Sequence, residues 1–444
     1  MELTTLNQSR ILTELTLGFH IIFATVGVGI PVMILIAEWM GIRKKDPHYI
    51  LLARRWSRAF TVTVAVGVVT GTAIGLQLSL LWPNFMQLAG QVIALPLLME
   101  TFAFFFEAIF LGIYLYTWDR FSNPLHHWLM GIPVVIGSSA SAFFITTVNA
   151  FMNTPQGFKI DQGRIIEIDP IQAMFNPATP SKVAHVLSSA YLTSAFILAA
   201  CAAWFILRGN QSAYYRKALR LTMACSLVFA LATGIIGDLS GKFLAHHQPE
   251  KLAAAEWHFE TKKNADLLLG GVLDPQTQEV KGAIVIPSGL SFLAHSRFDA
   301  EVKGLNDVPK DLWPPLITHY FFDVMVTIGM YLTIVPLLYI FAWVRNKGNE
   351  WNKWLLRSVV LGGPLSMVAI ECGWIFTEIG RQPWILRGYM RTVEGVTTSG
   401  DVGEMLILFT ALYVLLGVLC TFVLIRMFRR NSPESEMQKR KISM

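Results

Sequence analysis

Charged residues are scarce in this sequence. Only 15% of its 444 residues are Asp, Glu, Lys or Arg, whereas 53% are hydrophobic and the mean hydropathy is +0.49. Soluble globular domains carry about 25% charged residues, so this composition excludes that class and predicts a membrane protein. The apolar runs are long and do not alternate with polar residues, which favours membrane helices over a β-barrel.

Several motifs are also missing. The four cysteines lie singly within apolar runs and lack metal-site spacing, so we interpret them as small buried hydrophobic residues (Cys201, Cys225, Cys372 and Cys420). The first residues show no basic segment and no small-residue cleavage site, which predicts an uncleaved first span. No internal repeat supports a duplicated transporter architecture. The net charge of +6 comes from bases between apolar runs and does not indicate nucleic-acid binding.

Nine stretches are long enough to cross a bilayer, which takes roughly 20 apolar residues. They are residues 15–39, 58–81, 93–118, 127–150, 183–207, 218–238, 317–344, 355–378 and 404–425. The sequence therefore predicts an all-α polytopic membrane protein with nine transmembrane helices.

Lysine and arginine gather in alternate connections. They are Arg43, Lys44, Lys45, Arg54 and Arg55 after the first span, Arg208, Arg216, Lys217 and Arg220 after the fifth, Arg345, Lys347, Lys353 and Arg357 after the seventh, and Arg426, Arg429, Arg430, Lys439, Arg440 and Lys441 in the tail. Because basic connections stay on the cytoplasmic side, we expect the N-terminus outside and the C-terminus in the cytoplasm.

This orientation divides the chain into four parts. Residues 1–238 form a six-helix membrane region, 239–316 an outward loop, 317–428 a three-helix membrane region, and 429–444 a basic cytoplasmic tail. A connection as long as residues 239–316 is usually functional or disordered. It contains the helical-looking segment PEKLAAAEWHFETKK, followed by a stretch rich in Gly and Pro.

The segment ECGWIFTEIGRQPW, residues 371–384, closes the eighth span. Trp374 and Glu378 are four residues apart and share a helix face, and Arg381 follows at once. Such a cluster at a membrane helix end is costly to bury unless it coordinates or protonates a ligand. The alternative is an interfacial belt that only anchors the helix.

Four potential metal ligands are expected at similar depth near the outer face: His20, His185, Met325 and Glu378. Individually, each has an alternative explanation in hydrogen bonding or packing. Together they suit haem, because imidazole and thioether are good axial ligands and a single protein ligand leaves an open iron face for oxygen. Zinc or copper suits ligands scattered over four spans less well. Without a CxxCH motif, we expect no covalent haem attachment.

Glu100 and Glu107 lie seven residues apart in the third predicted span. Two helical turns, about 10 Å, separate them on one stripe. Buried carboxylates exchange protons readily, so the pair is typical of a proton path. The alternative is that they cap polar groups or pair with a loop.

With these residues in place, the chain resembles subunit I, the larger subunit, of cytochrome bd-type quinol oxidases. The similarity covers nearly the whole chain and five motifs: SRILTELTLGFH (residues 9–20), NAFMNTPQGF (149–158), GDLSGKF (237–243), QPEKLAAAE (248–256) and GWIFTEIGRQPW (373–384). The resemblance implies a respiratory enzyme of the bacterial cytoplasmic membrane that oxidises quinol and reduces molecular oxygen to water. It also implies a second polytopic subunit and a small single-span subunit as partners.

The resemblance assigns the haem ligands. His185 and Met325 would be the axial ligands of a low-spin haem b. His20 and Glu378 would serve two high-spin haems, one of b type and the other a haem d or a third haem b. Which residue serves which high-spin haem stays open.

The resemblance also assigns the quinol and proton residues. Lys251 and Glu256 match the quinol loop, where Lys251 would hydrogen-bond a quinone oxygen and Glu256 would accept a proton from quinol. Glu100 and Glu107 match acids associated with proton delivery, haem propionates or the oxygen site. The outward loop is short, which places the chain in the short-loop branch of the family.

Two further residues match positions beside the haems, Trp374 for packing and Arg381 for neutralising propionate charge. One departure stands two residues before Met325, where the family commonly has arginine and this chain has Asp323. A negative charge there should lower the reduction potential of the neighbouring haem unless His319, four residues earlier on the same face, compensates.

Two alternatives remain at this stage. A haem-b membrane anchor would relay electrons without reducing oxygen, and it would lack the open iron that binds carbon monoxide. An ion-coupled transporter would use Glu100, Glu107 and Asp323 as coupling sites and would show no haem absorption.

Overall fold

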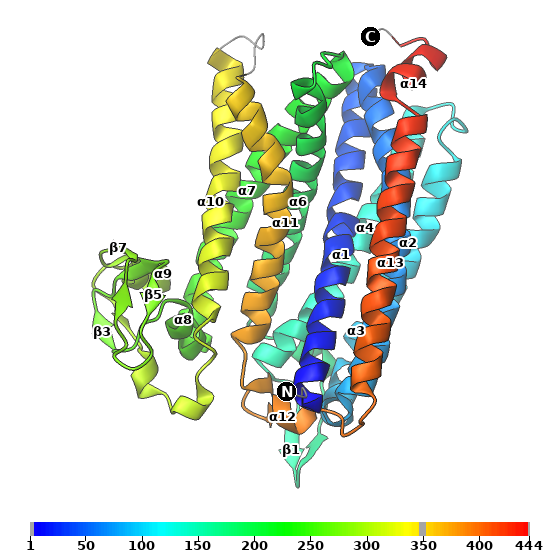
Figure 1. Ribbon diagram of the computed structural model, residues 1–444. Coiled ribbons are helices and arrows are strands. Elements are labelled where there is room, and N and C mark those ends of the chain that lie inside the picture. Colours follow the sequence, from blue (N-terminus) through cyan, green and yellow to red (C-terminus); the bar gives the residue numbers. More distant parts are fainter. Residues whose placement is uncertain (1–3, 346–351, 443–444) are drawn as a thin grey trace.

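The computed structural model describes residues 4–345 and 352–442. Within these residues, nine helices are long and apolar enough to cross a membrane, and they pack into one bundle (Figure 1). They are α1 (Thr5–Lys44), α2 (Pro47–Leu81), α3 (Pro83–Tyr116), α4 (Pro124–Asn153), α6 (Thr179–Leu207), α7 (Ala213–His247), α10 (Thr318–Arg345), α11 (Lys353–Ile379) and α13 (Val402–Arg430). The predicted all-α fold with nine spans is confirmed. Of the basic residues used to predict the orientation, Lys347 lies outside the described residues.

Local signals set the helix boundaries. Proline opens α2, α3 and α4, where its missing N–H is not needed. Asp46 caps α2 by accepting from the backbone N of His48 at 3.0 Å, and Asn123 caps α4 by accepting from Leu125. The helices exceed the predicted spans, since α1 begins at Thr5 and α7 runs to His247. Hydropathy detects the apolar segment, whereas the helix continues into polar turns outside it.

The two ends of the bundle differ in structure (Figure 1). The start of α1 and the connection between α7 and α10 lie at one end, which we name the loop end. The C-terminus lies at the opposite end, the tail end. An odd number of membrane helices places the start and the end of the chain at opposite ends of the bundle, as observed. That the loop end faces outward remains a prediction from the distribution of Lys and Arg.

Short elements connect the helices. At the loop end, after α4, come β1 (Lys159–Asp161), its antiparallel partner β2 (Arg164–Ile166), and α5 (Pro170–Met174). After α11 come β9 (Trp384–Leu386), its antiparallel partner β10 (Met390–Arg391), and α12 (Thr392–Gly395). These elements close the loop end around the segment that follows Glu378.

The long connection is built mostly from short antiparallel strand pairs. It contains α8 (Pro249–Ala255), β3 (Lys262–Lys263) paired with β8 (Glu301–Val302), β4 (Leu267–Leu269) with β7 (Ile284–Ile286), β5 (Val272–Leu273) with β6 (Val280–Lys281), α9 (Gly289–His295), and the 3-10 turns η1 (Leu305–Asp307) and η2 (Lys310–Leu312).

The helical prediction for PEKLAAAEWHFETKK is therefore wrong beyond Ala255. Trp257 adopts a positive φ of 45° and stacks on His319 with ring centroids 3.8 Å apart. Its indole N–H donates to Leu316 O at 2.8 Å. Tertiary contacts with the start of α10 thus override the local helical preference.

The tail end carries one further helix, α14 (Pro433–Lys439), within the predicted basic tail. Its Glu436 is buried and accepts from Arg55 and Arg58 of α2, each at 2.6 Å. Met437 is fully buried against the main hydrophobic core. The basic tail therefore folds back onto the bundle.

Candidate functional site

His20 projects between α1 and α2. Its Nδ1 lies 2.9 Å from Thr70 Oγ1, and the Thr70 hydroxyl donates in turn to Val66 O at 2.9 Å. The hydroxyl proton is therefore used on Val66, so His20 Nδ1 must carry the proton and donate. Among the described residues Nε2 takes no hydrogen bond, which leaves its lone pair for a metal in the usual ligand arrangement.

His185 of α6 and Met325 of α10 both lie in the loop half, on helices that each pack against α7 and α11. The His185 Nδ1 atom is buried without any hydrogen-bond partner, and its ring faces Gly237 of α7. A Cβ built on Gly373 of α11 would lie 3.1 Å from Met325 Sδ, so the sulfur points at the α10–α11 seam. A buried imidazole without partners and an inward-facing thioether both fit haem ligation.

Glu378 stands at the end of α11 in a network of donors. Asn149 Nδ2 donates to Glu378 Oε1 at 2.6 Å, and Arg381 forms an ion pair with Oε2. Lys182 of α6 donates to Asn149 Oδ1 at 2.7 Å. Three helices and the segment after α11 therefore orient one carboxylate.

Positive charge is in excess around Glu378. Lys182, Lys251 and Arg381 lie close enough to one another to repel electrostatically. Arg381 is only 6% exposed, and its Nη1 atom has no hydrogen-bond partner. Buried cations normally have matched counter-ions, so this pocket suits an additional anion such as the propionate groups of a haem.

Lys251 joins the loop to this pocket. Its Nζ donates to Thr377 O at 3.1 Å, across 126 residues of sequence. A Cβ on Gly380 would lie 2.6 Å from Lys251 Cε, so glycine permits this close approach. Burial, together with repulsion from Arg381, lowers the pKa of Lys251 to about 7.

Glu256 ends α8 and is 1% exposed. Neither carboxylate oxygen has a hydrogen-bond partner of good geometry, although the backbone of Leu268 lies near enough to favour the ionised form. Burial, with the charge of Asp323 as a second cause, raises the pKa of Glu256 well above its usual value. This carboxyl group therefore holds a proton strongly once it has accepted one.

Asp323 and His319 form the compensating pair suggested by the sequence. His319 Nε2 lies 3.1 Å from Asp323 Oδ2, and both side chains are buried. The negative charge near Met325 therefore has an adjacent cationic partner when His319 is protonated.

Glu100 and Glu107 both face α4. Glu100 Oε1 accepts from Ser141 at 2.8 Å, and Glu107 is 4% exposed and lies nearer the tail end. Trp374 is half-buried on α11 and makes no hydrogen bond within the described chain. The structure thus supports a shared stripe for the two acids.

The predicted residues fall into separate groups. Glu378, Arg381 and Lys251 meet in one pocket, whereas His20 lies at the α1–α2 seam. No cluster of three or more His, Cys, Asp or Glu side chains suits a single metal ion in the described part of the chain. Separate positions agree better with several porphyrins than with one metal centre.

Sequence reasoning missed four residues of this region. Asn149 and Lys182 orient Glu378. Glu14 interacts electrostatically with Glu378 and Arg381. Glu371 interacts with Glu14 and has a buried oxygen without a partner. For Asn149, Glu14 and Glu371 a place in a quoted motif was the only signal, and Lys182 had none, because no spacing rule joins these helices.

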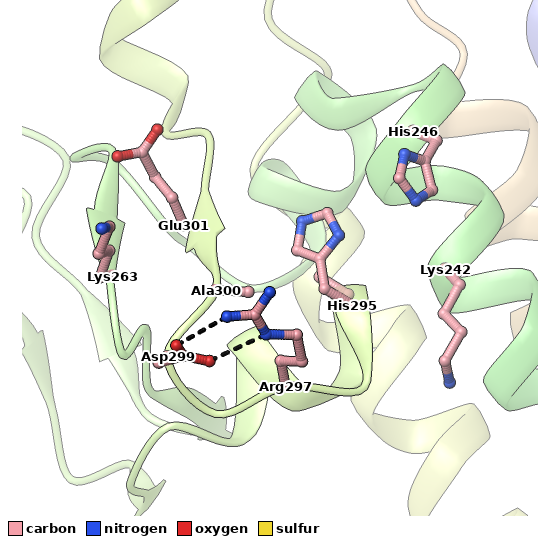
Figure 2. A pocket seen from close by; sticks show the side chains of 9 residues that line it. Lys242, His246, Lys263, His295, Arg297, Asp299, Ala300 and Glu301 are labelled. Carbon is pink, nitrogen blue, oxygen red and sulfur yellow. Dashed lines mark hydrogen bonds and ion pairs between the residues drawn. The ribbon is translucent and has the colours of Figure 1, made fainter.

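A cavity of about 620 Å³ opens beside the loop, between the end of α7 and α9 (Figure 2). Lys242, His295 and Arg297 are among its lining residues. Lys242 pairs with Asp238, and Arg297 pairs with Asp299 at 2.9 Å. The cavity is therefore largely neutral, and none of the predicted site residues lines it, so we assign it no part in the chemistry.

Comparisons with known proteins agree with this geometry. The family model for cytochrome bd terminal oxidase subunit I matches residues 8–432. A Bacillus subtilis (strain 168) protein assigned as a cytochrome bd menaquinol oxidase subunit I is 44% identical over 433 residues, covering 97% of this chain and 98% of the relative. The cytochrome bd-II ubiquinol oxidase subunit 1 of Escherichia coli (strain K12) is 26% identical over 503 residues, covering 97% of each chain.

A solved structure extends the agreement to the fold. The bd oxidase of Geobacillus thermodenitrificans superposes with a TM-score of 0.92 at 64% sequence identity, covering 96% of this chain and 99% of that chain. These matches support an oxygen-reducing quinol oxidase over the electron-relay and transporter alternatives. The chain belongs to the cytochrome bd terminal oxidase subunit I family, and it is the haem-carrying subunit I of a respiratory quinol oxidase of the bacterial cytoplasmic membrane, where it works with a subunit II.

Proposed function

We propose that this subunit oxidises quinol at its loop end, holds three haems in its loop half, and draws protons for oxygen reduction from the tail end. The observation that carries the proposal is the pocket in which Lys182, Lys251 and Arg381 surround Glu378. One wall of this pocket belongs to the quinol loop and another to the motif that ends α11. The bound quinol, which is the electron donor, and the haem propionates would therefore lie on adjacent sides of the same group of residues.

Each haem would be held by the residues already described. His185 and Met325 fit a six-coordinate low-spin haem b, and His20 and Glu378 fit two high-spin haems, of which one is b-type and the other a haem d or a haem b. Bound haem supplies one-electron transfer and, at an open iron face, the binding and reduction of oxygen. Arg381 Nη1 and Lys182 are available to neutralise propionate charge, and Trp374 to pack beside a ring.

The loop residues would handle the quinol itself. Lys251 uses one of its three N–H donors on Thr377 O, which leaves others for a quinone oxygen. Glu256 would take a hydroxyl proton whenever its carboxylate is ionised, because its buried oxygens lack side-chain donors and its pKa is raised. Oxidation at the loop would release these protons on the outer side.

The acids of α3 would deliver protons from the opposite side. Glu107 lies nearer the tail end and Glu100 follows on the same stripe, where Ser141 donates to it at 2.8 Å. Release outside and uptake from the cytoplasm would separate charge without a pump. A second polytopic subunit and a small single-span subunit would complete the enzyme around the apolar outer faces.

Quinol-driven oxygen uptake by the purified complex tests this proposal. Glu256→Gln should lower the rate at least about 100-fold, the scale of a lost general base, while dithionite still reduces every haem. Glu260→Gln is the matched control, since Glu260 is an exposed carboxylate of the same loop. Equal quinol oxidation by wild type and Glu256→Gln would refute the proposed quinol site.

A further inference from the structure

Two glycines of the quinol loop form hydrogen bonds with side chains in the first turns of α10. Gly270 and Gly271 form the turn between β4 and β5, and both have positive φ, 66° and 96°. Asp323 Oδ2 accepts from the backbone N of Gly270 at 2.5 Å, and His319 Nε2 lies 3.2 Å from Gly270 O. The Tyr320 hydroxyl donates to Gly271 O at 3.1 Å. Both polar groups of Gly270 are therefore held by one helix.

The same histidine holds the end of α8. Its Nδ1 lies 2.7 Å from Ala255 O, and its ring stacks on Trp257 at 3.8 Å. Ala255 and Trp257 are the two neighbours of Glu256 in the chain. The contacts of His319 thus fix the backbone on both sides of the proposed proton acceptor.

The polar groups around His319 come from the loop and from its own helix. They are Ala255 O, Gly270 O and the Asp323 carboxylate. Both ring nitrogens of His319 therefore face groups that accept hydrogen bonds, and Asp323 supplies the contact to the Gly270 amide.

An acceptor oxygen at position 323 is necessary for this arrangement. Arginine, which the family commonly carries at position 323, has only N–H donors and no acceptor for the Gly270 amide. The hydrogen bonds that hold Gly270 on α10 therefore depend on the Asp–His pair present in this chain.

We propose that His319 and Asp323 form a positioning clamp that fixes the quinol loop on α10 and aims Glu256 at the quinol. The proposal rests on the proposed role of Glu256 in quinol oxidation. The clamp residues need not touch the quinol, because they act through the backbone of Gly270 and of Ala255. They also link the loop directly to the helix that carries Met325.

Hydrogen exchange and quinol kinetics on the complex purified with its partner subunit test the clamp. In Asp323→Leu, peptides containing Gly270 should exchange at least about 10-fold faster, because a hydrogen bond to a charged group is lost. The kcat with quinol should fall by at least about 10-fold, while haem content and reduction by dithionite stay unchanged.

Two further variants make the result specific. Asp323→Asn keeps an acceptor for the Gly270 amide, so its exchange and kcat should stay within about 3-fold of wild type. Asp266→Leu is the matched control, because Asp266 Oδ1 accepts from Ser288 N at 3.0 Å inside the same loop without reaching α10. It should leave exchange at Gly270 unchanged.

Two results would overturn the clamp. One is wild-type exchange at Gly270 in Asp323→Leu, and the other is faster exchange with unchanged KM and kcat for quinol. Either result, beside a normal loss of activity in Glu256→Gln, would refute the clamp alone. Full quinol oxidation by Glu256→Gln would instead refute the quinol site on which the clamp depends.

Discussion

The tail end and the loop end treat buried charge differently. At the tail end, charged groups are matched within the chain: Arg54 with Asp119, Arg55 with Glu436, Lys217 with Asp46, and His127 with Glu38. At the loop end, buried polar atoms lack partners, namely His185 Nδ1, Arg381 Nη1, both oxygens of Glu256, Asp323 Oδ1 and Glu371 Oε1. The Nε atoms of Arg54 and Arg55 lack partners too, yet each of these two guanidinium groups keeps a carboxylate.

This difference indicates which end is built to bind a ligand. Buried polar groups in native proteins are nearly always paired, so orphaned atoms that gather at one end call for a ligand there. The matched pairs of the tail end need no ligand. They hold helices together, whereas the orphaned atoms of the loop end fit the proposed haem and quinol sites.

Two histidines make the contrast concrete. His127 lies 2.6 Å from Glu38 Oε1 and 2.9 Å from Tyr114 O, and it joins α1, α3 and α4. His319 has the same combination of a carboxylate and backbone carbonyl partners, but it joins α10 to a loop. One arrangement stabilises the bundle, and the other positions a reactive group.

The largest difference in oxygen uptake should appear when one carboxylate at each end is replaced by leucine. Glu378→Leu removes a proposed haem ligand and leaves Arg381 without its partner, so oxygen uptake should fall by more than about 100-fold. Glu436→Leu leaves Arg55 and Arg58 unpaired at the tail end, and its oxygen uptake per folded complex should change by less than about twofold. Comparable losses of turnover in both variants would break the distinction between the ends.

A smaller loss of turnover is expected when an acid of the proposed proton path, which runs from the tail end to the loop end, is replaced. Glu107→Leu should slow oxygen reduction by roughly 10- to 100-fold, because a proton-exchanging group is lost. Rapid mixing with quinol should still reduce the low-spin haem at the wild-type rate. Unchanged steady-state turnover would contradict a role for Glu107 in proton delivery.

At the tail end, removal of a partner should affect stability and not chemistry. Glu38→Leu leaves His127 and Tyr114 buried without their acceptor, which should lower the free energy of unfolding by about 3 kcal/mol. A thermal melt of the purified complex measures this loss. Turnover per haem should stay within about twofold, and a selective loss of turnover at normal stability would assign this cluster a functional role.

The smallest effect should be a pH-dependent gain of stability. The raised pKa of Glu256 means that the native state holds a proton that the unfolded chain releases. Its contribution to stability is therefore fully present below the unfolded pKa, near 4.5, and is lost as pH rises through the folded pKa. Gln has no proton to release, so Glu256→Gln should not lose stability in this way as pH rises. Its melting midpoint should therefore exceed that of wild type by about 2 °C or more at pH 8. The difference should shrink at pH 5, and a constant difference would argue against a protonated Glu256.

Sequence alone predicted the nine membrane helices and a set of candidate site residues. Long apolar runs locate membrane helices because no other structure satisfies their backbone in lipid. Residue type and resemblance predict His20, His185, Met325 and Glu378 as haem ligands, and this assignment stays a prediction. The two-residue strands of the loop have no detectable periodicity, so they could not be predicted.

The tertiary details of the site were also beyond the sequence. Lys251 reaches Thr377 across 126 residues, and Lys182 reaches Glu378 only through Asn149. Asp323 was noticed as a departure and His319 as its compensation, but the hydrogen bond to Gly270 required the fold. Long-range polar networks leave no periodic trace in a sequence.

Haem content tests the central claim most directly. The complex purified with its partner subunit should contain three haems for each copy of this chain, and His185→Leu should contain one b-type haem fewer. His126→Leu, which changes an exposed histidine of the tail end, should retain all three. A haem-free wild type, or an equal haem content in wild type and His185→Leu, would contradict the account.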